Sequence, residues 1–548
     1  MTTGRSDLDV LIVGAGPTGL ALATQLRMFG AQFRIVDRLK DRTRESRALA
    51  VQARTLELFQ TLGLAEGLVA RGQRSTRLKL HLEGRPVASA TLGDIAAVDT
   101  RYPFVLLVSQ AETENALDEW LRGSGVEVER GTELVSFEQD GHGLDCVLRR
   151  EDRRQERVHA RFLAGCDGAH STVRKASGIA FEGGTYPQEF ALADVEADGP
   201  LEPNAINSFA GRGGVAMFLP LGRPATWRVI AMSPADAAGM ASPSSPAMTN
   251  EIQLPDLQAL VDGPTERTVR LRDPVWLTRF RLHHRQTATY REGNVFLAGD
   301  AAHIHSPVGG QGMNTGIQDA WNLGWKIGLV ARGLAHERLL DTYEAERWRV
   351  GQFLLRYTDR LFGTLVRTMS DRPLATWARG VVIPRLVPHL FGSDAVRRAA
   401  FAFASELGIR YRQSPAVLEG EPRLPAGPHA GDRLPDAEIV VNGHSEYLQE
   451  AAIRPGLTLL LCGEPRAWNP VALHQLRQRY GAVVAACSLS TDGADGSWRD
   501  ANRNAFLRLG VREAAQYLVR PDGYIAFRSA GYTFQALDRY LAEWYVAT

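Results

Sequence analysis

The stretch from Asp9 to Asp37 constrains the fold more than any other part of this chain, because its pattern is typical of a strand, a glycine turn, a helix and a second strand. The apolar run Val10 to Val13 suits a short buried strand, and Pro17 is favourable in the first turn of a helix, whose free N–H groups attract phosphate. Asp37 ends the second strand, where a carboxylate can accept hydrogen bonds from ribose hydroxyls. The turn contains three glycines at G-x-G-x-x-G spacing, Gly14, Gly16 and Gly19. The stretch predicts a dinucleotide site and leaves NAD and FAD open.

Length and charge narrow the class of protein further. A chain of 548 residues corresponds to roughly two to four domains. Its 63 basic and 62 acidic residues balance to a net charge of +1, so no overall field favours nucleic acid or an anionic membrane. No apolar run approaches the about 18 residues of a membrane helix, and the polar start lacks a signal-peptide pattern. We therefore expect a cytoplasmic protein without a nucleic-acid or membrane partner.

The cysteines and histidines do not predict a metal site or a disulfide framework. The four cysteines lie far apart and form no C-x-x-C pair. His303 and His305 share a loop but lack a third ligand, so a structural role is favoured over metal binding. The cysteines are Cys146, Cys166, Cys462 and Cys487.

A second chemical stretch runs from Asn294 to Ile327. A buried strand leads to Gly299 and Asp300, and a glycine-rich loop then feeds a long helix that we expect to begin near Met313. Glycines in such a loop allow close contact with a planar ligand, and the positive end of the helix favours negative charge there. The carboxylate of Asp300 is suited to hold a ribityl or ribose hydroxyl.

Between Phe181 and about His284 the pattern changes to short apolar alternations separated by Gly and Pro turns, which predicts a second sheet. The segments VAMFLPL and ATWRVIAM are typical of a hairpin whose alternate side chains line a cavity. With Trp227 and Val229 facing the pocket, alternation places Arg228 on the other face, while Arg212 is another candidate partner for a substrate carboxylate. Packing into the sheet core is the alternative for each wall residue. The predicted wall residues are Met217, Leu219, Trp227 and Val229.

Three motifs in this order, GAGPTG with Asp37, CDGAHSTVR and GDAAHIHSPVGGQGMN, together resemble those of the class A FAD-dependent aromatic hydroxylases. SRALAVQARTLELF, RYPFVLLVSQAETENAL, GDRLPDAEI and RPDGYIAFR are similar to the longer members, the pentachlorophenol, hydroxyphenylpropionate and polyketide hydroxylases. The resemblance implies FAD as the cofactor and a role for Arg174 in supporting the turn of the second motif. The residues predicted to bind FAD are Gly14, Gly16, Pro17, Gly19, Asp37, Arg38, Arg47, Gln110, Asp167, Asp300, Pro307, Gly312, Met313 and Asn314.

The resemblance also implies an α/β architecture with three parts. A Rossmann-type FAD-binding domain is expected from residues 1–75, 106–180 and 285–400, and an inserted antiparallel-sheet substrate domain from residues 76–105 and 181–284. A thioredoxin-like C-terminal domain is expected from residues 425–548. Its redox function is not expected, because Cys462 is followed by Gly463, Glu464 and Pro465 instead of a second thiol. A structural or subunit-contact role is favoured, which leaves a homodimer open.

The activity that the resemblance implies is aromatic hydroxylation. NADH or NADPH would reduce FAD, dioxygen would add at the flavin C4a, and the hydroperoxide would transfer OH to a phenolic or polycyclic aromatic substrate. The flavin loop, with Pro307, Gly312, Met313 and Asn314, would support the reactive flavin, and no base that ionises a phenol is identified. A Baeyer–Villiger or antibiotic-inactivating monooxygenase is the alternative enzyme. A non-catalytic flavin-binding scaffold is the alternative of another class, against which the intact third motif argues.

Overall fold

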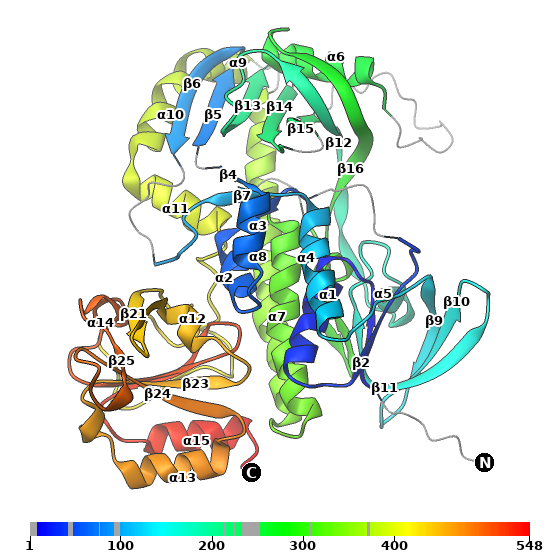
Figure 1. Ribbon diagram of the computed structural model, residues 1–548. Coiled ribbons are helices and arrows are strands. Elements are labelled where there is room, and N and C mark those ends of the chain that lie inside the picture. The colour runs from blue at the N-terminus through cyan, green and yellow to red at the C-terminus, as the bar shows by residue number, and fades with distance from the viewer. Residues whose placement is uncertain are drawn as a thin grey trace.

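The computed structural model describes residues 8–41, 48–75, 77–91, 99–211, 214–222, 225–232, 252–305, 310–369 and 373–548. Within these ranges the chain has an α/β fold with three eight-stranded sheets and one three-stranded sheet. The helix α7 (Gly312–Ala331) runs lengthwise through the middle of the molecule (Figure 1). In this view the sheet that contains β12 and β16, the second sheet, lies above α7. The sheet that contains β1, the first sheet, and the sheet that contains β23, the third sheet, lie on either side of α7.

The first sheet is mostly parallel, with one inserted antiparallel pair and an antiparallel strand at one edge. Its strand order is β17–β18–β11–β1–β2–β8, and β10 and β9 extend from β11 as an antiparallel pair. β1 runs parallel to β2 and β11, and β11 runs parallel to β18. The three strands that lead into the motifs, β1, β11 and β18, therefore end at the same edge of the sheet. The strands are β1 (Leu8–Val13), β2 (Phe33–Asp37), β8 (Glu129–Arg130), β9 (Thr132–Gln139), β10 (Leu144–Arg150), β11 (Gln155–Gly165), β17 (Arg291–Glu292) and β18 (Val295–Leu297).

Helices cover the first sheet, and α1 packs against both α4 and α7. A Cβ added to Gly324 of α7 would lie 2.4 Å from the Cβ of Gln25 in α1, so this glycine lets the two helices approach closely. The helix α4 is capped at its N-terminus, because the Ser109 side chain accepts a hydrogen bond from the backbone N–H of Glu112. The helices and turns of this part are α1 (Pro17–Met28), α2 (Ala53–Gln60), α3 (Ala65–Arg71), α4 (Gln110–Gly123), α5 (Thr172–Ala176), η2 (Gly299–Ala301) and η3 (Glu337–Leu340).

The second sheet is built around β12 and β16, two 18-residue strands that rise from the first sheet and pair antiparallel. Its order is β19–β16–β12–β15–β14–β13–β5–β6, and the predicted hairpin is confirmed as β14 and β15. The helix α6 (Leu254–Thr265) covers one face, while a three-stranded sheet of β3, β7 and β4 lies below the other. The strands are β3 (Ala50–Val51), β4 (Gln73–Ser75), β5 (Arg77–Leu82), β6 (Arg85–Thr91), β7 (Val105–Leu107), β12 (Phe181–Asp198), β13 (Ala205–Gly211), β14 (Gly214–Pro220), β15 (Trp227–Met232), β16 (Arg270–Thr287) and β19 (His303–Ile304).

A helical segment connects these parts to the third sheet. The long helix α8 (Asp341–Met369) reaches the second sheet, where Asp359 accepts a hydrogen bond of 2.6 Å from the hydroxyl of Tyr186. After it come α9 (Pro373–Trp377), a π-helical turn (Ala378–Val382), α10 (Ile383–Gly392) and α11 (Asp394–Ala404).

The third sheet has helices on both faces. Its order is β20–β27–β26–β23–β24–β25–β21–β22, and the side chains of β23 alternate between one apolar cluster that contains α13 and α15 and another that contains α12 and α14. The elements are β20 (Leu418–Glu419), β21 (Glu438–Val441), β22 (His444–Tyr447), α12 (Leu448–Ala452), β23 (Leu457–Cys462), η5 (Pro465–Ala467), α13 (Pro470–Tyr480), β24 (Val484–Ser490), η6 (Ala494–Gly496), β25 (Trp498–Arg499), α14 (Asn504–Leu509), β26 (Ala515–Val519), β27 (Ile525–Ala530) and α15 (Gln535–Trp544).

The third sheet meets the rest of the molecule through buried ion pairs. The turn before β27 places Arg520 between Asp522, at 2.6 Å, and Glu346 of α8, at 2.7 Å. Glu346 also binds Lys326 of α7 at 2.8 Å. Burial opposes a charge on Glu346, but Arg520 and Lys326 overcome this and hold the pKa of its carboxyl well below its usual range. The pairing removes the cost that an isolated buried charge would carry.

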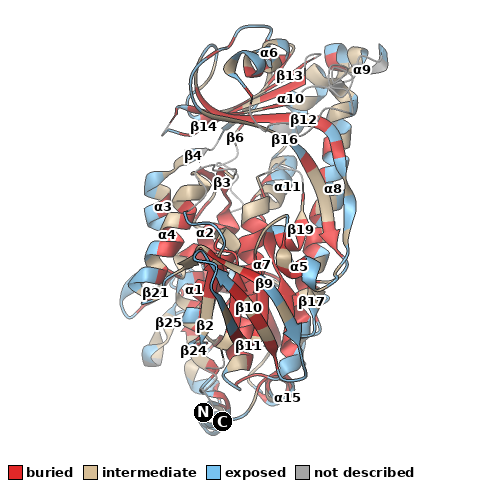
Figure 2. Ribbon diagram, turned by 90° about the vertical axis from the view of Figure 1, so that its right-hand side faces the viewer, coloured by how far each residue is buried: buried red, intermediate tan, exposed pale blue. Residues whose placement is uncertain are grey.

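Burial is concentrated on α7 and on the strands of the first sheet that face it, as the 90° view in Figure 2 shows. Among the described residues no helix is both long and apolar enough to cross a membrane.

Candidate active site

The glycine turn after β1 is held against the end of β11, where the CDGAHSTVR motif begins. Gly14 has a φ of +103°, and a Cβ there would lie 2.3 Å from the carbonyl oxygen of Cys166. A Cβ at Gly19 would lie 1.9 Å from the carbonyl oxygen of Gly14. A Cβ at Gly16 would meet no atom within 4 Å. The protein itself therefore requires the first and third glycines, whereas the second borders open space beside Pro17 at the start of α1.

Asp37 lies at the end of β2 beside this turn. One carboxylate oxygen accepts a hydrogen bond of 2.7 Å from the backbone N–H of Ala15, and the other accepts one of 2.8 Å from that of Leu39. A carboxylate oxygen can accept a second hydrogen bond, so the position suits a sugar hydroxyl. Arg38 is exposed on the following turn.

The CDGAHSTVR turn positions a buried carboxylate. One oxygen of Asp167 accepts hydrogen bonds from the backbone N–H groups of Thr172, at 2.6 Å, and Val173, at 3.2 Å. Its other oxygen is buried and has no hydrogen-bond partner among the described residues. Burial raises the pKa of Asp167. A buried acceptor of this kind is costly unless a further donor reaches it, and a hydroxyl of a bound ligand would satisfy it.

Arg174 connects this turn to the third motif. Its guanidinium donates hydrogen bonds of 3.0 Å to the carbonyl oxygen of Ala301 and 2.9 Å to that of Ala169, and it lies 4.0 Å from the ring centroid of Phe181. The supporting role that the resemblance implied for Arg174 therefore has a direct geometric basis.

A buried acid, Asp319, holds the third motif in place, and it was not identified from the sequence. Asp319 of α7 accepts hydrogen bonds from the backbone N–H of Gly299 at 3.1 Å and from Arg347 at 2.6 Å, and it lies 2.7 Å from His303 Nε2. Burial opposes its charge, but Arg347 and His303 lower the pKa of Asp319. His303 thus has a structural partner, and no group of three or more metal-ligating side chains occurs among the described residues. Asp300 is exposed beside this anchor.

The start of α7 is tied to β3. The amide of Asn314 donates to the carbonyl oxygens of Ala50, at 2.8 Å, and Gly310, at 2.9 Å, and accepts from the backbone N–H of Gln52 at 2.9 Å. The Asn314 side chain therefore holds the start of α7 against β3.

Among the described residues, the glycine at the start of α7 has room around it. A Cβ at Gly312 would meet only His305, at 3.9 Å, and Met313 is partly buried. Gln110 starts α4 and accepts a hydrogen bond of 3.2 Å from the backbone N–H of Ala48. Pro307 and Arg47 lie outside the described residues.

The predicted cavity wall is wrong in one respect. In the β14–β15 hairpin Met217 is paired with Ile230 and Leu219 with Arg228, so these side chains share a face. Trp227 and Val229 lie on the opposite face and pack beneath α6. Alternation gives two faces but does not say which one a distant helix covers, so the four residues cannot line one cavity. The face with Met217 and Leu219 packs toward Leu49, Ala50, Val105 and Leu107, and thus toward the start of α7.

Arg228 therefore faces the inner side of the sheet instead of pointing away from it. It forms a two-pronged pair with Asp194, at 2.7 and 2.8 Å, and donates a hydrogen bond of 3.2 Å to the carbonyl oxygen of Ala48. Trp276 donates to the same carboxylate at 2.6 Å. These partners are separated by 34 and 82 residues, so no local signal in the sequence joins them. Arg212, the other arginine considered, lies outside the described residues.

The described residues of the site combine a glycine turn with open space at Gly16, an unsatisfied buried acceptor at Asp167 and room around Gly312 at the start of α7. These features fit a nucleotide that is bound through its phosphate and sugar groups. Residues 7–358 match the model of an FAD-binding domain family, and residues 427–547 match that of the aromatic-ring hydroxylase C-terminal family. The chain belongs to these FAD-dependent aromatic-ring hydroxylases and is a flavoprotein monooxygenase, which confirms the resemblance drawn from the three motifs.

Relatives of known activity resemble the chain over most of its length. It is 36% identical over 522 residues to 6-methylpretetramide 4-monooxygenase of Streptomyces rimosus, covering 94% of this chain and 90% of that enzyme. It is also 36% identical to pentachlorophenol 4-monooxygenase of Sphingobium chlorophenolicum, covering 79% and 76%. The flavin-dependent monooxygenase PieE, solved in complex with FAD and substrate, matches with a TM-score of 0.80 and 25% identity over 98% of this chain and 100% of that chain.

Proposed function

We propose that this chain hydroxylates a bulky, uncharged phenolic or polycyclic aromatic substrate, with NADH or NADPH as transient electron donor and dioxygen as co-substrate. Bound FAD supplies the electron transfer and oxygen activation of this reaction. We assign residues 1–75, 106–180 and 285–400 to the FAD-binding domain and residues 76–105 and 181–284 to the substrate domain. Residues 425–548 are assigned to a thioredoxin-like domain with a structural role.

The chain's own contribution is to hold the cofactor and to place positive potential beside it. Asp37 and Asp300 are suited to sugar hydroxyls, and the unsatisfied oxygen of Asp167 is suited to a further hydroxyl. The first N–H groups of α7, at Gly312 and Met313, offer the positive end of a 20-residue helix to a negatively charged ligand edge. The remaining proposed contacts are Gly14, Gly16, Pro17, Gly19, Arg38, Arg47, Gln110, Pro307 and Asn314.

The substrate assignment rests on the burial of Arg228 and on its ion pair with Asp194. A small hydroxybenzoate needs a cation that is free to pair with its carboxylate. Arg228 is buried, and Asp194 already neutralises its charge with two hydrogen bonds. The other inner-face side chains named above, Met217, Leu219 and Ile230, are apolar. An apolar face with a neutralised cation favours a substrate without a carboxylate.

The test compares aromatic compounds under identical conditions with the purified yellow holoenzyme. NAD(P)H oxidation and oxygen uptake are measured with simple hydroxybenzoates, substituted phenols, naphthols and polycyclic quinones, and products are identified by mass and by position of the new oxygen. We expect tight coupling with bulky uncharged phenols and a new ring hydroxyl. Productive coupling with hydroxybenzoates alone would reject the apolar pocket, and a ring-expanded lactone would indicate Baeyer–Villiger oxidation instead.

A further inference from the structure

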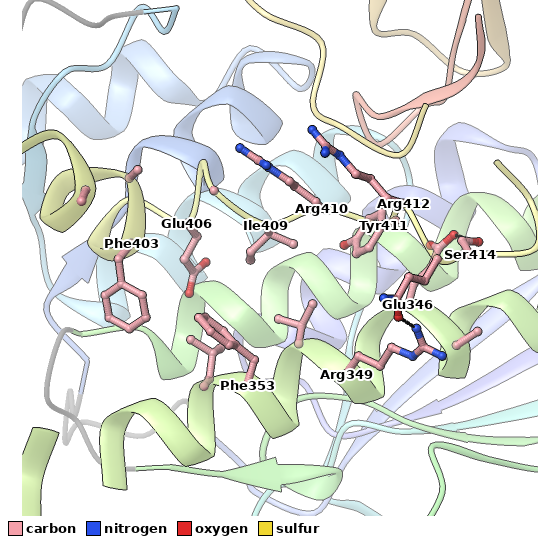
Figure 3. A pocket seen from close by; sticks show the side chains of 17 residues that line it. Glu346, Arg349, Phe353, Phe403, Glu406, Ile409, Arg410, Tyr411, Arg412 and Ser414 are labelled. Carbon is pink, nitrogen blue, oxygen red and sulfur yellow. Dashed lines mark hydrogen bonds between the residues drawn. The ribbon is translucent and has the colours of Figure 1, made fainter. Parts of the chain in front are cut away.

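A cavity of about 560 Å³ lies between α8, the end of α11 and residues 405–414 (Figure 3). This volume is in the range of small-molecule sites. None of its lining residues belongs to the glycine turn, the CDGAHSTVR turn or the second sheet, so it is distinct from the proposed oxygenation site. Its apolar lining includes Val350, Phe353, Leu354, Phe403 and Ile409.

Aromatic rings form one wall of the cavity. Phe353 is 56% exposed although it is a large apolar side chain, and its ring centroid lies 6.2 Å from that of Phe403. Phe403 is backed by Tyr357, at a centroid distance of 4.0 Å. A planar apolar molecule placed against Phe353 and Phe403 would remove this ring surface from water.

One of the arginines that line the cavity has no carboxylate partner among the described residues. Arg349 hydrogen-bonds the side-chain amide of Gln413, and no carboxylate within ion-pair distance of it occurs among the described residues. Arg412 is paired with Asp432 at 2.6 Å, and both Arg410 and Arg412 point away from α8.

The acids at the cavity do not offset Arg349. Glu346 is bound by Lys326 and Arg520. Glu406 is fully buried, and burial raises its pKa to about 8, so it is largely neutral at neutral pH. The cavity therefore combines an apolar body with a positively charged group.

We propose that this cavity is a second ligand site that takes a flat aromatic carboxylate, with its ring against Phe353 and Phe403 and its acid group at Arg349. Charge complementarity selects the anion, since Arg349 is the cation lining the cavity that has no acidic partner in the described part of the chain. This inference does not depend on the substrate proposed for the oxygenation site.

The same cavity is mechanically connected to the start of α7. Glu406 accepts hydrogen bonds from Thr315, at 2.9 Å, and from Gln318, both on α7. Gln311, which precedes α7, donates a hydrogen bond of 2.8 Å to the carbonyl oxygen of Phe403. A ligand that moves Phe403 or Glu406 would act through these hydrogen bonds on the described start of α7. We therefore expect the ligand to change the affinity for FAD, and FAD to change the affinity for the ligand by the same factor.

The test uses the FAD-loaded full-length protein and naphthoate as the probe, with its neutral alcohol analogue as the chemical control. Binding is measured by calorimetry without NAD(P)H, so turnover is not required and a failed hydroxylation assay leaves the result intact. We expect one naphthoate per chain. Arg349→Gln and the neutral analogue should each weaken binding by about tenfold or more, the size of one lost ion pair. Ala399→Trp, at an exposed lining position, should fill the cavity and abolish binding.

Arg356→Gln is the matched control, because Arg356 is exposed on the same helix and does not line the cavity. It should leave naphthoate binding unchanged. The rate of FAD release on dilution should change with naphthoate in the wild type and not in Ala399→Trp. Absence of binding, or binding that Arg349→Gln and Ala399→Trp leave intact, would overturn the site. An unaltered rate of FAD release with naphthoate bound would overturn the coupling.

Discussion

At the residue scale, the carboxylates around the proposed FAD site differ in their burial and in the contacts that they make within the protein. Asp37 and Asp167 accept backbone hydrogen bonds that hold their own turns, so their removal would disturb the fold as well as the ligand. Asp300 lies exposed on the short turn η2, and Asp319 of α7 holds the backbone of that turn. Because the Asp300 side chain is exposed, its removal opens no cavity in the core, so this position suits a test of ligand binding.

The Asp300→Ala variant should contain much less FAD after purification than the wild type, while its thermal midpoint as apoprotein stays close. A lost hydrogen bond to a charged acceptor is worth about 1.5–3 kcal/mol, or roughly tenfold to a hundredfold in affinity. Flavin content is read from absorbance, with Glu446→Ala, a partly exposed acid of the third sheet, as control. Full flavin occupancy in Asp300→Ala would show that the site assignment is wrong.

Glu406 should produce a pH dependence of stability that its Gln variant lacks. Its pKa is raised from 4.5 to about 8 by burial, so between these values the folded protein keeps a proton that the unfolded chain releases. The stability contributed by the neutral carboxyl is thus present below the lower value and lost as pH rises through the upper one. The advantage of wild type over Glu406→Gln should fall by about 1 kcal/mol or more from pH 5 to pH 8, measured by urea denaturation. A constant difference across this range would contradict the buried neutral carboxyl.

At the element scale, two glycine-to-alanine substitutions in the glycine turn should have different effects, one on FAD binding and the other on stability. Gly16 borders open space, whereas a Cβ at Gly19 would lie 1.9 Å from the carbonyl oxygen of Gly14. Gly16→Ala should therefore fold with a stability within about 0.5 kcal/mol of wild type but bind FAD poorly, because the methyl occupies the approach to the pyrophosphate. Gly19→Ala should lose about 1–3 kcal/mol through overpacking. Denaturation of the apoproteins and FAD titration check both, and equal stabilities would contradict the packing argument.

At this scale, a feature was predictable from the sequence where the residues that determine it lie close together in the chain. The strand–turn–helix unit at Gly14, the cap at Ser109 and the helix α8 were predictable because their determinants lie within a few residues. The hairpin β14–β15 was predictable, but its inner face was not, since α6 comes from a later segment. The arrangement of Arg228, Asp194 and Trp276 spans three strands, and the packing of residues 405–414 on α7 depends on contacts 88 and 91 residues apart.

At the scale of the whole molecule, the third sheet contains two free cysteines, Cys462 on β23 and Cys487 on β24. Cys462 is buried within β23, and burial raises its pKa far above the usual range, which disfavours the reactive thiolate. Cys487 lies on the neighbouring strand and accepts a hydrogen bond of 2.6 Å from Arg454. The segment with this second family match, residues 427–547, contains Arg520, which pairs with Glu346 of α8, and Glu346 in turn binds Lys326 of α7.

Replacing both thiols, Cys462→Ser and Cys487→Ser, should leave turnover within about twofold, because we expect no redox work from either sulfur and only a small packing change, under about 1 kcal/mol. The measurement is stimulated NAD(P)H oxidation at equal flavin content. A collapse of activity in a folded, flavin-loaded double variant would establish a redox role that the fold does not suggest.

The buried ion pairs between the third sheet and the two long helices should matter far more than the thiols. Arg520→Met leaves Glu346 and Asp522 buried without this partner, and breaking such a pair costs about 3–5 kcal/mol. Arg479→Met, which breaks the exposed pair with Asp538, should cost about 0–1 kcal/mol. Urea denaturation followed by tryptophan fluorescence compares the two, and limited proteolysis locates the loss at the third sheet. Equal small losses would mean that apolar packing alone attaches this sheet to the rest of the molecule.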